Sequence, residues 1–357
     1  MPARLLISGA GSPASNNLIR SLRAGDPSLG IAGFHSDRFV LRRSDADRRY
    51  LVPRTDHRSY RSALRRVMRV EGTDLLVPTS DGDVRALSRL RRGMAGRLFL
   101  PRHATIEMCQ DKYALALRLR AQEIPAPLTF AVTDLRRVDG LFRRLPSRGR
   151  VWCRMRTGSG SLGAIPVTKP GQVKSWIRHW QAMGRVRVDD FTLSEYLPGR
   201  DFGCQSLWKD GALVVVKTYE RLSYLGMAGS PGNVSSVATL AKTVREERIV
   251  EICARAVRAL DPRASGVFSI DLKENADGVP CVTDVNAGRF SSATAVYDLT
   301  GKHNMAATFV RLALGEPVDL RNEYDVAEDC YVLRDVDMPP SVFHADDFFD
   351  GIEEVRA

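Results

Sequence analysis

The sequence predicts a mixed α/β protein, with a parallel, Rossmann-like sheet in its first 105 residues and antiparallel strands with further helices after them. The first observation is that short apolar runs alternate with helical patterns up to residue 105, an order that builds a parallel sheet. The second is that residues 202–208 and 212–217 are apolar runs joined by the turn Lys209-Asp210-Gly211. Such spacing is typical of neighbouring antiparallel strands. The fold class is therefore α/β in the first part and α+β in the second.

The first 105 residues justify the parallel sheet element by element. Four apolar runs are expected to form its strands: residues 4–9, 29–34, 74–78 and 97–101. Helical patterns follow the first and third of these strands, at residues 17–23 and from residue 78 to about residue 91. This strand–helix alternation predicts one Rossmann-like domain.

The turn after the first expected strand reads GAGSPA, residues 9–14, and matches the G-x-G-x-x-A dinucleotide fingerprint. Asp37 follows the second expected strand, about where an acid that binds a ribose would lie. A nicotinamide oxidoreductase is therefore one alternative. The fingerprint alone is weak evidence, because other α/β folds use a glycine-rich first turn for other anions or for packing.

A helix and a glycine-rich loop begin the second part of the chain. Asp111 caps a helical pattern over residues 111–122, which ends before Pro125 and Pro127 because proline does not continue a helix. An expected strand at residues 151–155 leads into the loop RTGSGSLG, residues 156–163. Glycines let backbone N–H groups approach phosphate oxygens. The loop lacks the GK[ST] ending of a Walker A motif, and the tip of a hairpin is the alternative.

The remaining elements are two helices and two less regular segments. Thr243 and Glu246 have capping-box spacing and are expected to open a helix with apolar residues at 249, 253, 256, 257 and 260. Residues 303–314 are amphipathic and stop at Gly315. Residues 224–236 are rich in Gly, Ser and Asn and predict a mobile loop, and the acidic last 40 residues predict a small appended element.

Three oxygen-bearing side chains are expected to meet on one hairpin. Residues 266–272 and 279–285 are apolar runs on either side of a turn signal at residues 275–278. Folding about that turn brings Asp271 roughly opposite Asp284, and Asn286 shares the face of Asp284. Neighbouring carboxylates repel each other unless a cation lies between them, and Mg²⁺ is the usual one. The alternative is that these acids flank a turn and are solvated.

Composition narrows the class of protein. The 357 residues carry a net charge of +11, mostly from arginine. No long basic run, zinc-finger spacing or aromatic RNA-binding signature accompanies that charge, so nucleic-acid binding is kept only as an alternative. The sequence shows no run long enough to span a membrane and no convincing signal peptide. Six scattered cysteines without a CxxC pair indicate reduced thiols and a cytoplasmic location.

The order of these parts, with four specific stretches, resembles the ATP-grasp superfamily, and within it the carbamoyl-phosphate-synthase-like branch. The stretches are DK at 111–112, GSGSLG at 158–163, EYLPGRDF at 195–202 and DVNAGRFSSATAVYDLTG at 284–301. The resemblance covers roughly residues 5–315. It implies a Rossmann-like pre-ATP-grasp domain at 1–105, a small ATP-grasp subdomain at 106–190, a large one at 191–320 and a C-terminal appendage at 321–357.

The resemblance also implies the site residues. The groups expected to bind ATP are Lys112, Arg154, the loop residues Gly158, Ser159, Gly160 and Ser161, the adenine-facing Glu195 and Leu197, and the ribose-facing Asp201. Asp271, Asp284 and Asn286 are expected to bind Mg²⁺, and Arg289 to steady the transferred phosphate. The sequence departs from the family at three points: Arg154 stands where Lys is general, Asp284 where Glu is usual, and Asn-Ala-Gly-Arg where Asn-Pro-Arg is usual.

The predicted function is an ADP-forming ligase that joins a carboxylate to an amine through an acyl phosphate, with ATP and Mg²⁺ as cofactors. We further expect Lys217 and Arg221, at the end of a strand, to act in catalysis by holding the carboxylate substrate or the phosphates. A carbamoyl-phosphate-synthase-like kinase or carboxylase and a non-catalytic relative are further alternatives. The expected partners are small-molecule carboxylate and amine substrates, without nucleic acid or membrane. The sequence leaves the oligomeric state open, a homodimer being one option.

Overall fold

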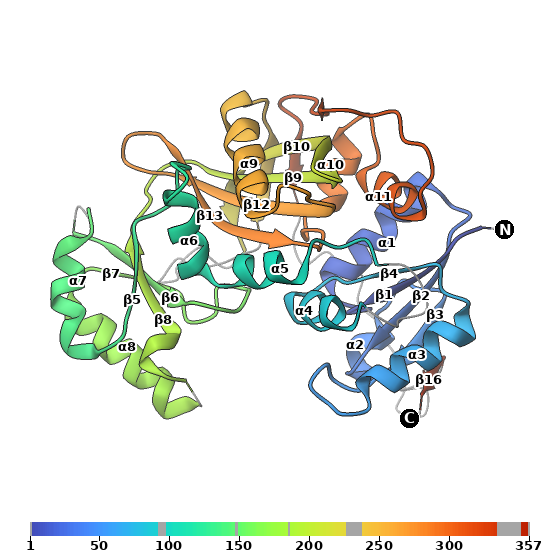
Figure 1. Ribbon diagram of the computed structural model, residues 1–357, viewed down its shortest axis with the longest axis horizontal. Coiled ribbons are helices and arrows are strands. Elements are labelled where there is room, and N and C mark those ends of the chain that lie inside the picture. The colour runs from blue at the N-terminus through green and yellow to red at the C-terminus, as the bar shows by residue number, and fades with distance from the viewer. Residues whose placement is uncertain are drawn as a thin grey trace.

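The computed structural model describes residues 2–91, 98–146, 149–184, 186–225, 238–333 and 351–355, without the side chains of residues 295 and 296. Its strands form three sheets, each in a separate unit (Figure 1). The N-terminal unit lies at the lower right of Figure 1, the small four-stranded unit at the left and the large seven-stranded unit above and between them.

The N-terminal unit is a parallel sheet with helices, as the sequence predicts. Its five strands follow the order β16-β3-β2-β1-β4, and every pair is parallel. The strands are β1 (Arg4–Ser8), β2 (Gly30–His35), β3 (Arg48–Leu51), β4 (Leu75–Val77) and β16 (Ile352–Glu354). The helices are α1 (Pro13–Gly25), α2 (Arg38–Arg42), α3 (Tyr60–Glu71) and α4 (Asp81–Leu90). Strand β16 comes from the far end of the chain and adds an outer strand to this sheet.

The fourth strand predicted for this domain, at residues 97–101, is wrong where the structure describes it. Residues 98–101 belong to no strand, and Arg97 lies outside the described residues. Arg91 Nη2 donates to the carbonyls of Leu100 and Pro101. The apolar side chains of Phe99 and Leu100 are buried all the same, so this segment packs into the core beside Gly266 of β12 without forming a strand itself.

Two consecutive helices lead from the N-terminal unit to the small one. They are α5 (His103–Gln110) and α6 (Lys112–Arg120), with Asp111 between them. The Asp111 carboxylate accepts hydrogen bonds from the backbone N–H groups of Tyr113 and Ala114, which confirms it as the N-cap of α6. Lys112 therefore occupies the first position of α6, at the end of the helix that carries a partial positive charge.

The small unit has its own core. Its four strands follow the order β5-β8-β6-β7 and are all antiparallel. The elements are β5 (Thr129–Ala131), η1 (Leu135–Arg137), α7 (Val138–Arg144), β6 (Val151–Met155), β7 (Ile165–Val167), α8 (Pro170–Met183), η2 (Val188–Asp190) and β8 (Phe191–Glu195). Val151, Cys153, Phe191 and Leu193 fill the sheet side of this core, and residues of α7 and α8 cover it.

The large unit is built on long antiparallel strands. Its sheet has the order β13-β12-β9-β10-β11-β15, with the short β14 parallel to β10. The strands are β9 (Asp201–Lys209), β10 (Ala212–Tyr224), β11 (Ala238–Thr243), β12 (Gly266–Glu274), β13 (Pro280–Ala287), β14 (Glu323–Tyr324) and β15 (Tyr331–Leu333). The predicted hairpins β9–β10 and β12–β13 are both confirmed. The mobile loop predicted at residues 224–236 falls almost wholly outside the described residues.

Three helices pack on the large sheet: α9 (Glu247–Leu260), α10 (Thr294–Thr300) and α11 (Met305–Leu314). The capping box predicted at Thr243 is wrong. Thr243 belongs to β11, and its hydroxyl donates to the Ala327 carbonyl and accepts from the Cys330 N–H, so it is not available to cap a helix. Helix α9 starts at Glu247 without a side-chain cap bond. Its predicted apolar face is nevertheless the buried one.

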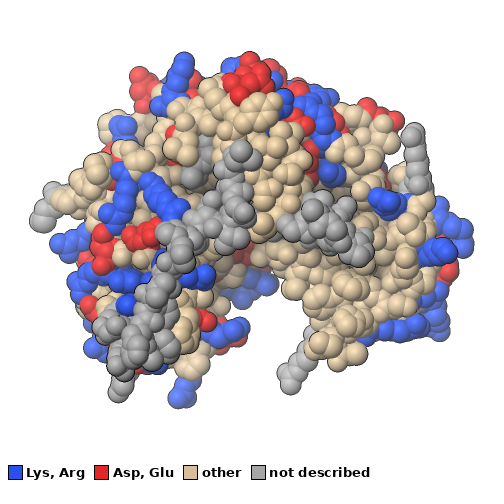
Figure 2. All heavy atoms as spheres, turned by 180° about the vertical axis from the view of Figure 1, so that it is seen from behind, with Lys and Arg blue, Asp and Glu red and all other residues tan. Residues whose placement is uncertain are grey.

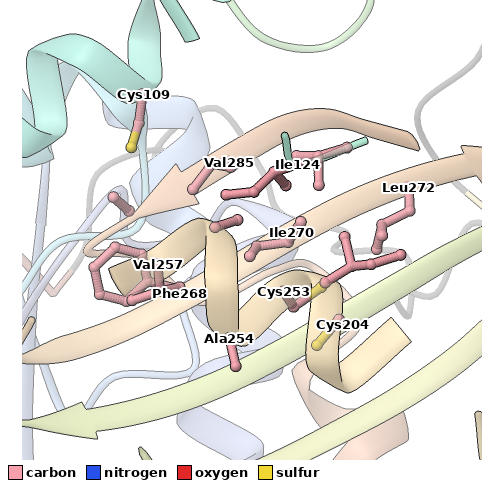
Figure 3. Packing of buried hydrophobic residues seen from close by; sticks show 14 of the residues in the cluster. Cys109, Ile124, Cys204, Cys253, Ala254, Val257, Phe268, Ile270, Leu272 and Val285 are labelled. Carbon is pink, nitrogen blue, oxygen red and sulfur yellow. The ribbon is translucent and has the colours of Figure 1, made fainter. Parts of the chain in front are cut away.

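Two cores determine how the units sit together. One lies between α9 and strands β9, β12 and β13, and Figure 3 shows Cys204, Cys253, Phe268 and Ile270 within it. The other joins the N-terminal sheet to the large sheet through side chains such as Ile7, Val215, Val267 and Phe309. Because these two units share one core, they are expected to move together, whereas the small unit has a core of its own.

The cysteines are free, as the sequence analysis expects, and the charged surface is divided. All six cysteines are free thiols, and five of them are buried. On the face shown in Figure 2, Lys and Arg side chains lie in separate groups with uncharged surface between them. Within the described part of the chain, no helix has the length and apolar character needed to cross a membrane.

Candidate active site

The acidic pair of the β12–β13 hairpin forms as predicted. Asp271 is paired directly with Asp284 across the two antiparallel strands, and Asn286 is paired with Ser269. Directly opposed residues of an antiparallel pair place their side chains on the same face. The turn at residues 275–279 closes with the Asn275 side chain, which accepts from the N–H groups of Asp277 and Val279. Continued unbroken, the register of this turn would place Thr283 opposite Asp271; a β-bulge shifts the register by one residue and brings Asp284 opposite Asp271.

Arg221 links Asp271 to a second acid. It lies on β10, directly opposite Asp201 of β9. Its Nη1 donates to Asp201 Oδ1 at 2.8 Å, and its Nη2 donates to Asp271 Oδ1. The other oxygen of Asp201 accepts from the Tyr224 hydroxyl at 2.5 Å and lies 3.4 Å from Lys273 Nζ. Arg221 therefore fixes the positions of two carboxylates from neighbouring strands.

Lys112 connects the acidic hairpin to the glycine-rich loop. Its Nζ donates to the Gly158 carbonyl at 2.8 Å and lies 3.4 Å from Asp284 Oδ2. Its backbone N–H donates to the Arg156 carbonyl, so the first residue of α6 is held against the start of the loop. The Lys112 ammonium thus contacts both the acidic hairpin and the glycine-rich loop, between which the sequence analysis leads us to expect a triphosphate.

Arg154 reaches the same hairpin from the small unit. It lies on β6, and its Nη2 donates to the Thr283 carbonyl at 2.9 Å, next to Asp284 on β13. Burial lowers the pKa of Arg154, while the charges of Asp284 and Asp271 oppose that change. Its Nε is buried and has no hydrogen-bond partner among the residues that the structure describes. A buried guanidinium with a donor to spare is suited to receive an anionic group.

The glycine-rich loop joins antiparallel strands β6 and β7, so it is both a hairpin connection and a candidate phosphate loop. Its base is anchored, because Trp176 Nε1 of α8 donates to the Gly163 carbonyl. Gly158, Gly160 and Ser161 have positive φ angles of 111°, 67° and 60°. No atom lies within 4 Å of where a Cβ of Gly160 would be. Ser159 is exposed, so the tip of the loop is open to a ligand.

Glu195 and Leu197 lie on the segment that connects the small sheet to the large one. Glu195 ends β8, and its carboxylate accepts from the Leu128 N–H at 3.0 Å, while its own N–H donates to the Leu128 carbonyl. Leu197 is buried between β8 and β9. The structure therefore places both residues at the junction of the two sheets.

The N-terminal unit contributes a residue that the sequence analysis missed. Arg289, just after β13, donates through Nε to Asp81 Oδ1 and through Nη2 to Asn286 Oδ1 at 2.5 Å. Asp81 is the first residue of α4. The only signal in the sequence was that Asp81 follows the apolar run of β4, at the carboxyl edge of the parallel sheet.

The structure places Lys217, for which a catalytic role is predicted, in a buried ion pair. Its side chain is 1% exposed and is paired with Asp325 at 2.9 Å. Its Nζ also donates to the carbonyls of Tyr297 and His303. Lys217 shares a strand face with Arg221, as the alternation of β10 requires, but the segment around α10 covers it. Lys217 is therefore part of a buried ion pair and lies outside the cluster around Asp271 and Asp284.

The donor set on the hairpin suits a hard cation. Asp271, Asp284 and Asn286 offer only oxygen ligands, which Mg²⁺ prefers. Burial raises the pKa of the Asp271 carboxyl; the charge of Arg221 opposes this, and that of Asp284 adds to it. A cation next to Asp271 would relieve that cost. In the described residues, no three or more His, Cys, Asp and Glu side chains gather as a metal site, so these residues would share the ion with other oxygen ligands.

Taken together, basic groups from two sheets face an acidic hairpin beneath an open glycine loop, and this arrangement is that of an ATP-grasp fold. Among solved structures with this fold, the L-amino acid ligase from Bacillus licheniformis matches with a TM-score of 0.67 and 15% identity over 87% of this chain and 74% of that chain. The biotin carboxylase domain of 2-oxoglutarate carboxylase from Hydrogenobacter thermophilus was solved with MgADP and bicarbonate. It matches with a TM-score of 0.70 and 12% identity over 93% of this chain and 73% of that chain.

A third solved structure is similar over most of the chain. Carboxyaminoimidazole ribonucleotide synthase from Aspergillus clavatus, complexed with ATP, matches with a TM-score of 0.69 and 12% identity over 93% of this chain and 81% of that one. No protein-family model and no curated protein matches the chain. The likeness establishes the fold, and the carbamoyl-phosphate-synthase-like branch stays a prediction.

Proposed function

We propose that the protein is an ADP-forming ligase that activates a carboxylate with ATP and joins it to an amine. The observation that carries this proposal is the meeting of Asp271 and Asp284 with Lys112 of helix α6 and Arg154 of β6 in the small sheet. Phosphoryl transfer needs charge neutralisation and alignment more than covalent help from the protein. A cluster of acids and bases between two sheets supplies both.

The triphosphate would lie between the glycine loop and the hairpin. Lys112 and Arg154 would donate to phosphate oxygens, because both groups already point to the hairpin and Arg154 Nε has no partner. The loop Gly158–Ser161 would close over the phosphates with its backbone N–H groups. Its open tip and positive φ angles support this assignment.

The nucleoside would lie at the junction of the two sheets. Glu195 and the backbone of Leu197 would bind the adenine edge, since both lie on the segment that connects β8 to β9. Asp201 would hold the ribose. Its Oδ2 accepts a hydrogen bond from the Tyr224 hydroxyl, which is the kind of bond a ribose hydroxyl would make in its place.

A divalent cation completes the proposed site. Mg²⁺ held by Asp271, Asp284 and Asn286 would neutralise negative charge on the phosphates. Arg221 would keep Asp271 in place for this purpose, because it binds Asp271 and Asp201 at once.

The proposed reaction has two steps. A carboxylate oxygen attacks the γ-phosphorus, ADP leaves, and an acyl phosphate forms. An amine then attacks the acyl carbon, loses a proton and displaces inorganic phosphate, which leaves an amide. Arg289 would stabilise the transferred phosphoryl group, and Asp81 and Asn286 would orient its guanidinium.

Carboxylation is a second candidate. Two of the similar structures are a biotin carboxylase domain solved with bicarbonate and a carboxyaminoimidazole ribonucleotide synthase. The first step would be the same, with bicarbonate as the carboxylate. A product screen separates the two candidates, because only one of them depends on bicarbonate.

The screen uses the purified full chain with ATP, Mg²⁺ and pools of amino acids and small carboxylates, with and without bicarbonate. We expect ADP together with a new mass equal to a condensed carboxylate–amine pair. A bicarbonate-dependent product would favour carboxylation, and AMP would contradict both candidates. A homodimer and a cytoplasmic location remain predictions, which sedimentation and cell fractionation would check.

A further inference from the structure

A pocket of about 470 Å³ lies at the end of the large sheet where β9 turns back into β10. Its lining comes from this turn, from the last turns of α9 and α11 and from residues 318–322. Asp271 of the proposed active site is paired with Gly203, six residues before Lys209 on β9. At ~3.3 Å per residue, this separation is about 20 Å along the strand. The pocket is therefore separate from the proposed active site, and its volume is within the range of small-molecule sites.

The floor of the pocket is apolar. Leu213 and Val214 of β10 and Leu312 of α11 line it and are buried. Val318 and Leu320 line it as well, and they pack, partly buried, against the core that contains Val214 and Leu312. Removing hydrocarbon from water is favourable, so this floor attracts the apolar part of a ligand.

The charged part of the lining is cationic. Of the described residues that line the pocket, Lys209, Arg258 and Arg321 are positive and exposed, and none is acidic. The Lys209 ammonium lies 5.3 Å from the centre of the Phe99 ring, and the Arg258 guanidinium lies 5.4 Å from the centre of the Trp208 ring. Within the described part of the chain, neither arginine forms an ion pair. Two full positive charges at the rim are thus available to an anion.

The acids near the pocket do not cancel these charges. Four acids lie within two residues of a lining residue in the sequence, and none of them lines the pocket: Asp210, Glu316, Asp319 and Glu323. Asp210 lies 3.9 Å from Lys209 Nζ, but its side chain is 79% exposed, so water screens this pair. Glu316 and Glu323 each lie within 4.0 Å of a basic side chain outside the lining, and Asp319 is exposed. The rim therefore remains positive.

Two helices end at the pocket, and a helix C-terminus carries a partial negative charge. The last carbonyls of both helices have partners, however. The N–H groups of Asp261 and Gly315 donate back to the last turns of α9 and α11, and Arg118 donates to the Ala259 carbonyl. The Asp261 carboxylate is itself paired with Arg102 at 2.6 Å. Neither helix end therefore offsets the two free guanidinium groups.

We propose that this pocket binds a small carboxylate with an apolar body, with its hydrocarbon part on the floor and its carboxylate at Arg258 and Arg321. The floor alone would accept any hydrocarbon and the rim alone any anion, so the two together select a molecule that is both. A second copy of the chain fits this lining less well, because the centres of chain–chain interfaces are poor in charged residues. The binding is independent of the proposed function.

Calorimetric titration of the full chain with octanoate, butyrate and octylamine, at constant pH and ionic strength, tests both halves of the proposal. We expect octanoate to bind at one site per chain. Butyrate should bind at least about tenfold more weakly, because each fully buried methylene contributes about fourfold in affinity. Octylamine, which has the same chain with a positive head, should not bind. Equal binding of octanoate and octylamine would mean an apolar patch only, and absence of octanoate binding would likewise overturn the proposal.

Variants of the rim place the carboxylate. The double variant Arg258→Gln/Arg321→Gln should lower the affinity for octanoate about tenfold, since each exposed charge contributes at most about fivefold. The single variant Arg321→Gln removes no hydrogen bond or ion pair of the described chain, so its smaller loss of affinity cannot come from unfolding. The matched control Arg178→Gln, on the exposed side of α8 in the small unit, should bind octanoate as the wild type does. Unchanged affinity in the double variant would refute the assignment.

Two other places for the carboxylate or for the pocket are separated by further measurements. Octanoate could bind in the proposed active site, so Arg289→Gln should leave its affinity unchanged. Binding that Arg289→Gln removes and the double variant retains would place octanoate in the active site and overturn the proposal. Sedimentation equilibrium checks for a second copy of the chain: we expect octanoate to leave the molecular mass unchanged. A dimer that octanoate or the double variant dissociates would assign this face to a chain–chain interface instead.

Discussion

Replacing Lys217 by Met tests whether this residue supports the fold or the chemistry. Lys217 Nζ lies 2.9 Å from Asp325 Oδ2, and the two side chains are 1% and 2% exposed. Removing the ammonium leaves the Asp325 carboxylate buried without its counter-ion. Breaking a buried pair in this way costs roughly 3–5 kcal/mol. The same change at Lys242, whose partner Asp329 is 75% exposed and 3.5 Å away, should cost at most about 1 kcal/mol.

Urea unfolding followed by circular dichroism measures both variants against the wild type. We expect Lys217→Met to lower the free energy of unfolding by about 3–5 kcal/mol. The double variant Lys217→Met/Asp325→Leu should recover only part of this, because Asp298, 3.8 Å from Lys217 Nζ and 4% exposed, also loses its counter-ion, and Leu cannot accept from the N–H groups of Lys302 and His303. The KM for ATP of the folded Lys217→Met protein should not change. A normal unfolding midpoint with a raised KM would refute the buried ion pair as the role of Lys217 and restore the catalytic one.

Three further predictions concern the acidic hairpin, pH and Arg289. Asp284→Asn should lower turnover by at least about 100-fold with little change in Tm, because it removes charge from the proposed metal site. The control variant Asp277→Asn, in the exposed turn, should keep its activity. Near-normal turnover in Asp284→Asn would contradict the metal assignment. Burial opposes the low pKa of Asp325, but Lys217 and two backbone N–H groups hold it below its ordinary value of 3.8. The ionised Asp325 carboxylate therefore stabilises the fold at pH values above 3.8, and this stabilisation is lost as the pH falls through the lower pKa of the folded state. Wild-type urea midpoints should accordingly fall more steeply below pH 4 than those of Asp325→Asn. Parallel curves for the two proteins would refute this. Arg289→Lys keeps the positive charge, but an ammonium cannot bind Asp81 and Asn286 as the planar guanidinium does. We therefore expect kcat to drop about tenfold or more. An unchanged kcat would exclude a catalytic role for the guanidinium geometry.

The parts of the site that lie close in sequence were predictable. The turn at residues 275–278 was enough to bring Asp271 and Asp284 near each other on the hairpin, but the β-bulge that places them directly opposite was not visible in the sequence. In the same way, Asp111 was recognisable as a cap because a helix N-terminus is specified by the residues next to it. Such features depend on local turn and cap chemistry, which a single sequence records directly.

Contacts between distant segments were not predictable. Asp81 and Arg289 are 208 residues apart, and no local pattern indicates that α4 faces the hairpin. For Lys217, the sequence indicated a place at the end of a strand but not the segment that covers it, which includes Asp325 from a region without clear pattern. Thr243 misled for a related reason: its spacing fits a capping box, but its hydroxyl donates to the Ala327 carbonyl and accepts from the Cys330 N–H.

Oxygen transfer from the carboxylate to phosphate tests the central claim most directly. The carboxylate found in the product screen is labelled with ¹⁸O in both oxygens, and the reaction with ATP is followed by ³¹P NMR. If an acyl phosphate forms, the bridging carboxylate oxygen leaves with the phosphate, so one ¹⁸O should appear in inorganic phosphate and none in the nucleotide. Label in AMP would show adenylation instead, and inorganic phosphate without label would show that ATP hydrolysis does not pass through the carboxylate. Either result would contradict the proposed ligase.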